Sequence, residues 1–388
     1  MTMTKQPSRS GPERSGPTQS GPTQSGPRRS GPARILILGG GHFSVLISPR
    51  AIRCTVILIT TVVAFALLAT AFGTRWLPIS DIVAGLTGQG DRAMSLTVRE
   101  FRLPRVVVGI LVGMALGASG AITQSLTHNP LGSPDVLGVV SGASAGAVAV
   151  MLAAGGSTVG AGGAAAALSR VGVPLGAVAG ALLSAAIVLG IASRRFGALP
   201  ATHRVVLVGV ICNAVFIGLV QWGLTVGDVD QAAKAAVFLA GSLHGRGWEH
   251  VVGVGLAVTV LIPLALLMKR SLDALQLGDD SAVTLGVPVA RVRLGLFVIA
   301  FALAGAAVAA AGAVSFVALL APQLARRIAP GAGTPLLAPA LLGAALLLVA
   351  DMVARHLVPG TELPAGAVTA LVGAPALLVL LLRMGERR

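Results

Sequence analysis

Few side chains in this sequence could carry out chemistry on their own. The 6 histidines are scattered without the spacing of metal ligands, and no nucleophile or carboxylate pair is placed beside a base. The phosphate-binding pattern Gly-x-x-x-x-Gly-Lys-Ser/Thr is absent, and the only lysines are Lys5, Lys234 and Lys269. The sequence therefore predicts a protein that is not an enzyme, has no catalytic residues, and holds no metal or cofactor directly.

Three arginines stand where a partner could reach them. Arg102 and Arg105, in Arg102-Leu-Pro-Arg105, directly precede an apolar glycine-rich run, and Arg355 ends another apolar run. Guanidinium groups pair bidentately with carboxylates, which makes these residues candidates for docking an acidic partner. Contact with lipid headgroups is the alternative interpretation.

A second candidate site is the polar stretch that separates two later apolar runs. Gly278 and Gly286 bracket a short helix-compatible segment, and Asp279 and Asp280 suit its first turn, where the helix dipole favours anions. Such a helix outside the membrane could dock a cytoplasmic partner, although an ordinary capped loop would look the same. The candidate residues of this docking segment are Leu277, Gly278, Asp279, Asp280, Leu285 and Gly286.

The composition shows which elements must position these residues. The chain has 388 residues, 54% hydrophobic and 11% charged, with a mean hydropathy of +0.86. Because soluble domains carry about 25% charged residues, we expect an all-α polytopic membrane protein with about ten transmembrane helices. The predicted spans are Cys54–Gly73, Pro104–Leu126, Asp135–Ala153, Pro174–Ser193, Val205–Val226, Val251–Met268, Leu294–Ala311, Val314–Ile328, Pro335–Ala354 and Pro364–Leu382.

Basic residues predict the orientation. If the N-terminus is cytoplasmic, the pairs Arg194/Arg195, Lys269/Arg270, Arg291/Arg293 and Arg326/Arg327 all fall on the cytoplasmic side, as the positive-inside rule requires. An even span count then places both termini in the cytoplasm of a multi-pass plasma-membrane (inner-membrane) protein. The net charge of +15 is accounted for by this topology signal and a basic tail, so we expect membrane lipid and no nucleic acid as a partner.

The N-terminal region differs from the rest of the chain. Between Gly11 and Ser30 the unit Gly-Pro-x-x-Ser repeats, and Pro and Gly at that density do not form a packed element. We therefore divide the chain into a disordered, basic, Gly/Pro/Ser-rich cytoplasmic tail at residues 1–53 and a ten-helix transmembrane domain at residues 54–388.

Glycines predict how the helices pack. Gly109, Gly113 and Gly117, and again Gly138, Gly142 and Gly146, recur at every fourth position, which gives a smooth helix face for close contact. Gly113, Gly120 and Pro130 also recur at a constant offset as Gly305, Gly312 and Pro322. This offset suggests an inverted repeat of the second to fifth and seventh to tenth helices.

An ordered set of motifs then resembles a known family. Its members are Arg102-Leu-Pro-Arg105, Asn129-Pro-Leu-Gly-Ser-Pro-Asp135, Ala240-Gly-Ser-Leu-His-Gly245, Leu277-Gly-Asp-Asp280, Ala321-Pro-Gln-Leu-Ala-Arg-Arg327, Ala350-Asp-Met-Val-Ala-Arg355 and Glu362-Leu-Pro-Ala-Gly366. Together they resemble the iron–siderophore and cobalamin permease family of ABC importers, and look most like a ferric enterobactin permease subunit.

The resemblance implies a translocation subunit for ferric siderophores of the catecholate, enterobactin-like class. It implies a homologous permease partner, in a heterodimer or a homodimer. It also implies two ABC ATPase subunits that hold ATP and Mg, and a siderophore-binding lipoprotein or periplasmic protein outside. It assigns docking to Arg102, Arg105 and Arg355 and ATPase coupling to the segment from Leu277 to Gly286. The candidates for the gate and pathway are Thr202, Asn129 and Pro130.

Two other functions stay open at this point. An ion-coupled secondary transporter of a small organic or metal-chelate substrate is one, although the nearly uncharged spans argue against proton coupling. A membrane anchor or sensor without transport is the other.

Overall fold

The computed structural model describes residues 34–38, 43–47, 49–73, 76–87, 91–153, 163–194, 202–328, 334–358 and 360–385. The chain divides into two units, Met1–Pro49 and Arg50–Arg388. In the first, β1 (Arg34–Leu38) pairs antiparallel with β2 (Phe43–Ile47), and the Val, Ile and Phe residues of both strands favour extended backbone. These strands lie within the range expected as a disordered tail, and the Gly-Pro-x-x-Ser repeat lies outside the described residues.

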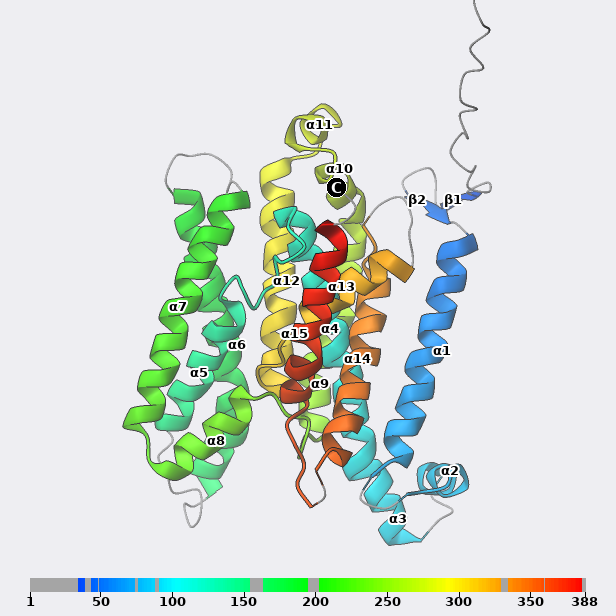
Figure 1. Cartoon of the computed structure of the whole chain (residues 1–388), viewed down its shortest axis with the longest axis vertical. Coiled ribbons are helices and arrows are strands. Elements are labelled where there is room, and N and C mark those ends of the chain that lie inside the picture. The colour runs from blue at the N-terminus through cyan, green and yellow to red at the C-terminus, as the bar shows by residue number, and fades with distance from the viewer. Residues whose placement is uncertain are drawn as a thin grey trace, which may run out of the picture. The chain divides into compact units, whose positions relative to one another are not determined.

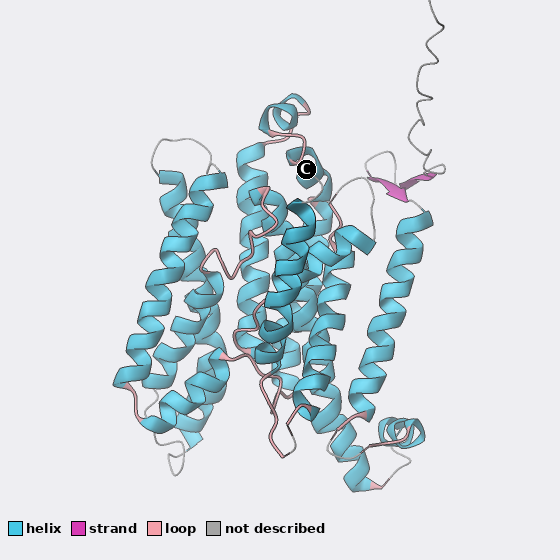
Figure 2. Ribbon diagram, in the orientation of Figure 1, coloured by secondary structure: helices cyan, strands magenta, loops and turns pink. Residues whose placement is uncertain are grey.

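In the part of the second unit that the structure describes, the named elements are all helices, joined by loops and two isolated β-bridges (Figures 1 and 2). Its elements are α1 (Pro49–Ala71), α2 (Ile79–Thr87), α3 (Arg92–Leu96), the π-helix η1 (Thr97–Arg102), α4 (Leu103–Thr127), α5 (Val139–Ala153), α6 (Gly163–Arg194), α7 (Thr202–Val226), α8 (Val229–Leu239), α9 (Trp248–Leu267), α10 (Lys269–Leu275), α11 (Asp279–Thr284), α12 (Val289–Ala311), α13 (Val317–Ile328), α14 (Leu337–His356) and α15 (Ala365–Gly385). The predicted all-α class is confirmed for this unit.

Each predicted span overlaps one helix, but the helices differ in length. Among the described residues, 7 helices are long and apolar enough to cross a membrane, and α5 and part of α15 are shorter apolar helices. The helix α13 has 12 residues and contains Pro322, so at 1.5 Å per residue it is about 18 Å long, less than a ~30 Å hydrocarbon core. The count of ten spans stays a prediction.

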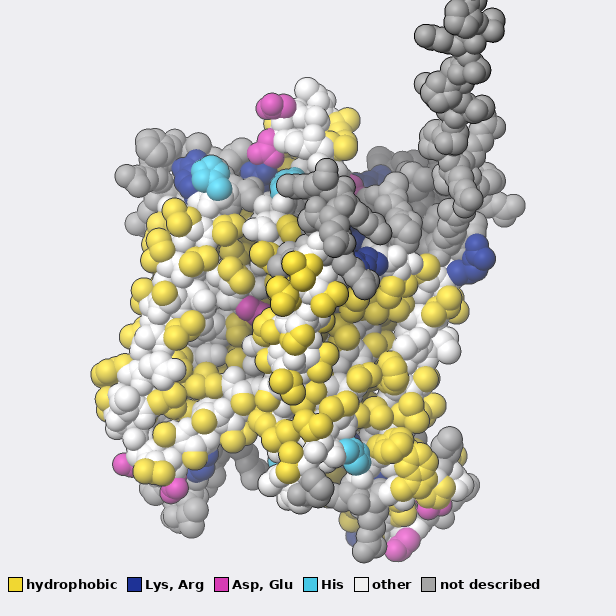
Figure 3. Space-filling view, in the orientation of Figure 1, with side chains coloured by type: hydrophobic (Ala, Val, Ile, Leu, Met, Phe, Trp, Pro, Cys, Tyr) yellow, Lys and Arg dark blue, Asp and Glu magenta, His cyan; other side chains and the backbone are white. Residues whose placement is uncertain are grey.

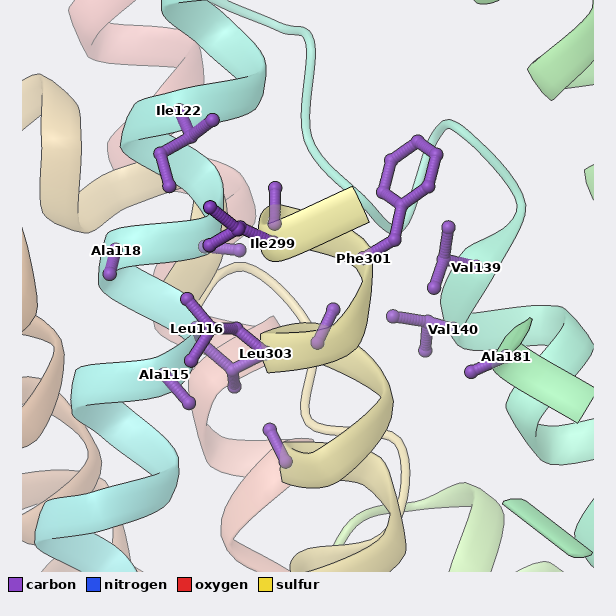
Figure 4. Close-up of a cluster of buried hydrophobic side chains, with 14 of the residues drawn as sticks. Ala115, Leu116, Ala118, Ile122, Val139, Val140, Ala181, Ile299, Phe301 and Leu303 are labelled. Carbon is purple, nitrogen blue, oxygen red and sulfur yellow. The ribbon is translucent and has the colours of Figure 1, made fainter. Parts of the chain in front are cut away.

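The helix α4 lies at the centre of this unit and packs on α9, α12, α13 and α14. Figure 4 shows Leu116 and Ile122 of α4 facing Ile299 and Leu303 of α12, with Val139 and Val140 of α5 beyond. The side chains of Leu116, Ile122 and Leu303 are almost completely buried. Packing of these buried side chains therefore holds the helices around α4 in place. The outer helices carry exposed Leu, Ile and Val side chains on the surface of the unit.

Glycines allow the closest helix contacts. A Cβ on Gly113 or Gly117 would overlap the α14 backbone, at Gly343 and at Pro339 respectively. A Cβ on Gly142 would meet Ser184 and the Gly180 carbonyl of α6, and Gly146 lies against Gly176 of the same helix. Gly109 contacts Leu243 and Leu348, and Gly138, at a φ of +80°, contacts α7. The α4–α14 and α5–α6 pairs thus approach backbone to backbone.

The ends of the helical unit differ in character. The short helices α10 and α11 lie at one end and α2 and α3 at the opposite end (Figure 1); we call these the α11 end and the Arg105 end. Figure 3 shows hydrophobic side chains over the middle of the visible face, whereas most charged ones lie near the two ends. This distribution is typical of a protein that spans a bilayer.

The suggested inverted repeat stays a prediction, because the matched positions have mixed local structure. Gly113 and Gly305 both lie inside helices, α4 and α12. Gly120, however, lies inside α4, whereas Gly312, with a φ of +78°, ends α12. Pro130 lies in a turn and Pro322 in a helix.

Candidate functional site

A buried carboxylate joins two of the three predicted docking arginines. Arg105, in the first turn of α4, donates from Nε and Nη2 to Oδ1 of Asp351, at 3.3 and 2.8 Å. Arg355, one turn after Asp351 on α14, donates from Nη2 to the other carboxylate oxygen. The Asp351 side chain is 2% exposed. The glycine contacts between α4 and α14 therefore also bring this cluster together.

Arg355 and the third arginine, Arg102, also bind the end of α1. Arg102 donates from Nη1 to the carbonyls of Thr70 and Ala71, at 2.8 and 3.1 Å. Arg355 donates from its own Nη1 to the carbonyls of Ala69 and Phe72, each at 3.1 Å. The last carbonyls of a helix lack intrahelical donors and form the negative end of its dipole, so two guanidinium groups stabilise them.

A second carboxylate closes the cluster on its outer side. Oε2 of Glu362, in the loop between α14 and α15, accepts from Nη1 of Arg105 at 2.9 Å and lies 2.7 Å from Nδ1 of His244. Partial burial acts to raise the Glu362 pKa, but the hydrogen bonds from Arg105 and His244 outweigh it, and the pKa lies below its usual value. Glu362 is therefore ionised at neutral pH.

The sequence predicted that the three arginines lie at one end of the bundle, but it did not identify the carboxylates that bind Arg105 and Arg355. Asp351 and Glu362 stand 246 and 257 residues from Arg105, and nothing local pairs them. The four-residue spacing between Asp351 and Arg355 was the available signal, because such residues are neighbours on a helix face. A carboxylate inside an apolar span also requires a partner.

At the α11 end, the predicted coupling residues form an exposed cap. The expected helix is present as α11, between Gly278 and Gly286, whose φ values are +102° and +77°. Asp279 and Asp280 lie in its first turn, and Asp279 pairs with Arg293 of α12 at 2.5 Å. Leu277 and Leu285 are exposed, together with Val283. Because they lie outside the apolar spans, these side chains suit a contact with another protein.

Polar contacts bind this cap to the bundle. Gln276, just after α10, donates to the Ser125 carbonyl near the end of α4 at 2.8 Å. Asp273 of α10 accepts from the backbone N–H of Thr334, before α14, at 2.5 Å. No local sequence pattern indicates either residue, because the partners are 151 and 61 residues away in the sequence.

The α4 end is in turn joined to α13. Gln124 donates to the Leu319 carbonyl at 3.0 Å and accepts from Arg326 at 2.6 Å. Gln323 donates to the Pro130 carbonyl at 2.8 Å. A continuous set of hydrogen bonds thus runs from α10 through α4 to the short helix α13.

Of the gate candidates, the structure describes the surroundings of Asn129 and Pro130 but not the side chain of Thr202. Asn129 and Pro130 follow the left-handed residue His128 that ends α4, and the Asn129 side chain accepts from the Leu131 N–H at 2.9 Å. Thr202 is the first residue of α7, and its side chain lies outside the described residues. Among the residues described, no group of three or more His, Cys, Asp or Glu could hold a metal ion.

These features define a polytopic helical membrane protein with separate polar sites at its two ends. A comparison with protein families matches residues 59–383 to the FecCD transport family. The chain therefore belongs to the FecCD transport family, and is a transport subunit of the plasma membrane rather than an enzyme, which confirms the resemblance seen in the sequence.

Individual relatives agree with this assignment. The chain is 35% identical over 342 residues to the ferric enterobactin transport system permease protein FepG of Escherichia coli, covering 88% of this chain and 99% of that protein. It is 36% identical to the Fe(3+)-citrate import system permease protein YfmE of Bacillus subtilis, covering 86% and 95%. Among solved structures, a metal-chelate type ABC transporter in an inward-facing conformation matches with a TM-score of 0.73, 25% identity, and coverage of 85% and 99%.

Proposed function

We propose that this protein is a membrane-spanning subunit of an ATP-driven importer of ferric siderophores. The observation that carries the proposal is the match to FepG along nearly the whole of that permease. Catecholate chelates of the enterobactin class are the proposed cargo. Relatives at similar identity are permeases for ferric citrate, so the chemical class of the chelate requires a direct measurement.

The Arg105 end is the proposed outer face. With this orientation, Arg270, Arg291 and Arg327 lie on the cytoplasmic side with the α11 end, as the positive-inside rule favours. A siderophore-binding protein delivers the chelate to the outer face, where Arg102 and Arg105 contact its acidic residues. Arg355, predicted with them as a docking residue, has a side chain that is only 7% exposed and is held by Asp351 and by the Ala69 and Phe72 carbonyls, so it positions the cluster instead of contacting the partner. Both termini are cytoplasmic.

The α11 end is the proposed site of energy input. Two ATPase subunits bind ATP and Mg, and this chain binds neither. Leu277, Val283 and Leu285 on the exposed cap enter the ATPase surface, and a second, homologous permease completes the pathway. Closure of the ATPases moves α10 and α11, and Gln276 and Asp273 transmit this movement to α4 and α14.

Reconstitution tests both levels of the proposal. The importer, with its second permease, ATPases and binding protein, is placed in proteoliposomes, and uptake of ⁵⁵Fe is measured with enterobactin, citrate or a hydroxamate as the chelator. We expect ATP-dependent uptake that is fastest with enterobactin. Faster uptake with citrate or hydroxamate would reject the catecholate assignment alone. Uptake that persists without the ATPases and collapses with an ion gradient would reject the importer.

A further inference from the structure

The guanidinium group of Arg105 has two sides that are occupied differently. Its inner side, Nε and Nη2, is bound by Asp351, which is 2% exposed and also holds Arg355. Its outer side, Nη1, is bound by Glu362, whose side chain is 33% exposed. The inner carboxylate therefore fixes the position of Arg105, while the outer one lies where solvent or another protein can reach it.

We propose that Glu362 occupies the place on Arg105 that an acidic side chain of the docking protein takes, and that docking displaces it. This inference rests on the proposed function only in that a binding protein docks at the Arg105 end. It adds that the docking site is filled in the undocked subunit, and that affinity depends on an exchange of one carboxylate for another.

The backbone around Glu362 indicates that the side chain alone would move. The Leu363 N–H donates to the Ala354 carbonyl at 3.1 Å, and the Gly366 N–H donates to the Gly241 carbonyl at 2.8 Å. On the other side, the Thr361 N–H donates to the Val358 carbonyl at 3.4 Å, across a turn that contains Gly360 at a φ of +83°. The loop is thus held on both sides of Glu362, and rotation of its side chain is sufficient to vacate Nη1.

The neighbouring residues Asp351 and His244 keep the free-energy cost of exchanging one carboxylate for another on Arg105 small. Arg105 stays paired with Asp351 throughout, so no buried charge is left without a partner. The displaced Glu362 still has His244, whose exposed ring lies beside the same oxygen. The carboxylate that enters replaces the one that leaves, and the charge at Nη1 is unchanged.

A permanent structural role for Glu362 predicts the opposite result. If Glu362 served to orient Arg105 for docking, its removal would weaken docking. If Glu362 competes with the partner, its removal strengthens docking. The direction of the change in affinity therefore separates the two interpretations.

The experiment uses the complete importer in lipid nanodiscs and the purified, chelate-loaded binding protein of the same importer. The dissociation constant is measured by biolayer interferometry for the wild type, Glu362→Gln and Glu362→Asp. Asp230→Asn is the matched control, because it removes a negative charge from the exposed start of α8, also at the Arg105 end (Figure 1). Thermal melting verifies that each variant is folded.

We expect the importer with Glu362→Gln to bind the binding protein up to about fivefold more tightly than the wild type. A partly exposed ion pair such as Arg105–Glu362 is worth at most about that factor in affinity, so its loss cannot raise the affinity further. Glu362→Asp, whose shorter side chain reaches Arg105 poorly, should change in the same direction, and it decides the question if the glutamine variant does not fold. The effect should vanish in an Arg105→Gln background, and Asp230→Asn should stay within about twofold of the wild type.

Unchanged or weaker binding by the Glu362 variants, with normal binding by the wild type, would overturn this inference and leave the proposed function standing. An equal gain in the Asp230→Asn control would also overturn it, since the cause would then be general electrostatics. Absence of saturable wild-type binding, together with absence of ATP-dependent uptake, would reject the proposed function and the inference with it.

Discussion

At the scale of single residues, the cluster at the Arg105 end depends on one buried acid. Asp351 pairs with both Arg105 and Arg355, and the latter also binds the α1 carbonyls. Two guanidinium groups that approach each other require an anion between them, because like charges repel strongly where water is excluded. Asp351 thus joins α1, α4 and α14 through charge as well as through packing.

This role predicts a large effect of a small substitution. Asp351→Asn keeps the shape of the side chain but leaves two partly buried guanidinium groups without their shared anion. We expect a loss of about 3 kcal/mol in stability, as for other broken buried pairs, measured by thermal and denaturant unfolding in detergent. Asp230→Asn, at an exposed position, should change stability by less than about 0.5 kcal/mol. Similar stability of the two variants would contradict the central role of Asp351.

The arginines were predictable from the sequence, whereas the pairing of Arg105 with Asp351 and Glu362 was not. Arg102 and Arg105 stand out because charges are rare beside an apolar run. Asp351 and Glu362 look like ordinary residues near span ends, and only the folded bundle brings them to Arg105. Pairing across some 250 residues depends on tertiary contacts, which no local pattern records.

At the scale of helices, the close packing of α4 on α14 is the contact that a small substitution should disturb most. A Cβ at Gly113 meets backbone atoms of Gly343 and Ala344, which cannot rotate away. We expect Gly113→Ala to destabilise the protein by about 1–3 kcal/mol, as overpacking does in other cores.

Gly218→Ala in α7 is the matched control, since a Cβ there meets nothing within 4 Å. It should be neutral or slightly stabilising, because alanine is the better helix former. Comparison of the melting temperatures of Gly113→Ala and Gly218→Ala in the same detergent separates the cost of the steric overlap from the effect of alanine on helix propensity. A Gly113→Ala variant as stable as the control would show that α4 and α14 can separate.

The coupling segment gives a prediction about movement between helices. Gln276→Leu removes the hydrogen bond from α10 to the Ser125 carbonyl while leaving the exposed face of α11 unchanged. In the assembled importer we expect ATP hydrolysis to continue while the number of chelates imported per ATP falls several-fold. Gln231→Leu, in the first turn of α8, is the control of the same residue type. Equal losses of hydrolysis and import would instead indicate that ATPase docking itself has failed.

At the scale of the whole molecule, hydropathy predicted the spans better than their ends. The runs Pro104–Leu126 and Val205–Val226 fall almost on α4 and α7, because continuous apolar sequence is sufficient to define them. The predicted run Asp135–Ala153 begins earlier than α5, since Pro134 and Gly138 precede a helix that starts only at Val139. The short helices α2, α3 and α8 were not predicted, because at 9, 5 and 11 residues they are too short to appear as apolar runs of span length.

The distribution of charge between the two ends predicts how the molecule is oriented in the membrane. Basic residues in short loops favour the cytoplasm, and the α11 end carries Lys269, Arg270 and Arg291. The Arg105 end also carries arginines, but Asp351 and Glu362 compensate the charge of Arg105 and Arg355, so these residues contribute little net positive charge. At the α11 end, Asp273 compensates Lys269 and Asp279 compensates Arg293 in the same way. Arg270, Arg291 and Arg327 are further basic residues there, so the α11 end should face the cytoplasm.

Cysteine labelling can measure this directly. In a variant with Cys54 and Cys212 replaced by serine, a single cysteine is introduced by Val283→Cys, on exposed α11, or by Val229→Cys, at the exposed start of α8. The permease is expressed without the ATPase subunits, which would cover α11. A membrane-impermeant maleimide should then label the Val229→Cys protein in intact spheroplasts and the Val283→Cys protein only in inverted vesicles. The reverse pattern would place the ATPase-docking surface outside the cell, where ATP is absent, and would exclude the proposed direction of energy input.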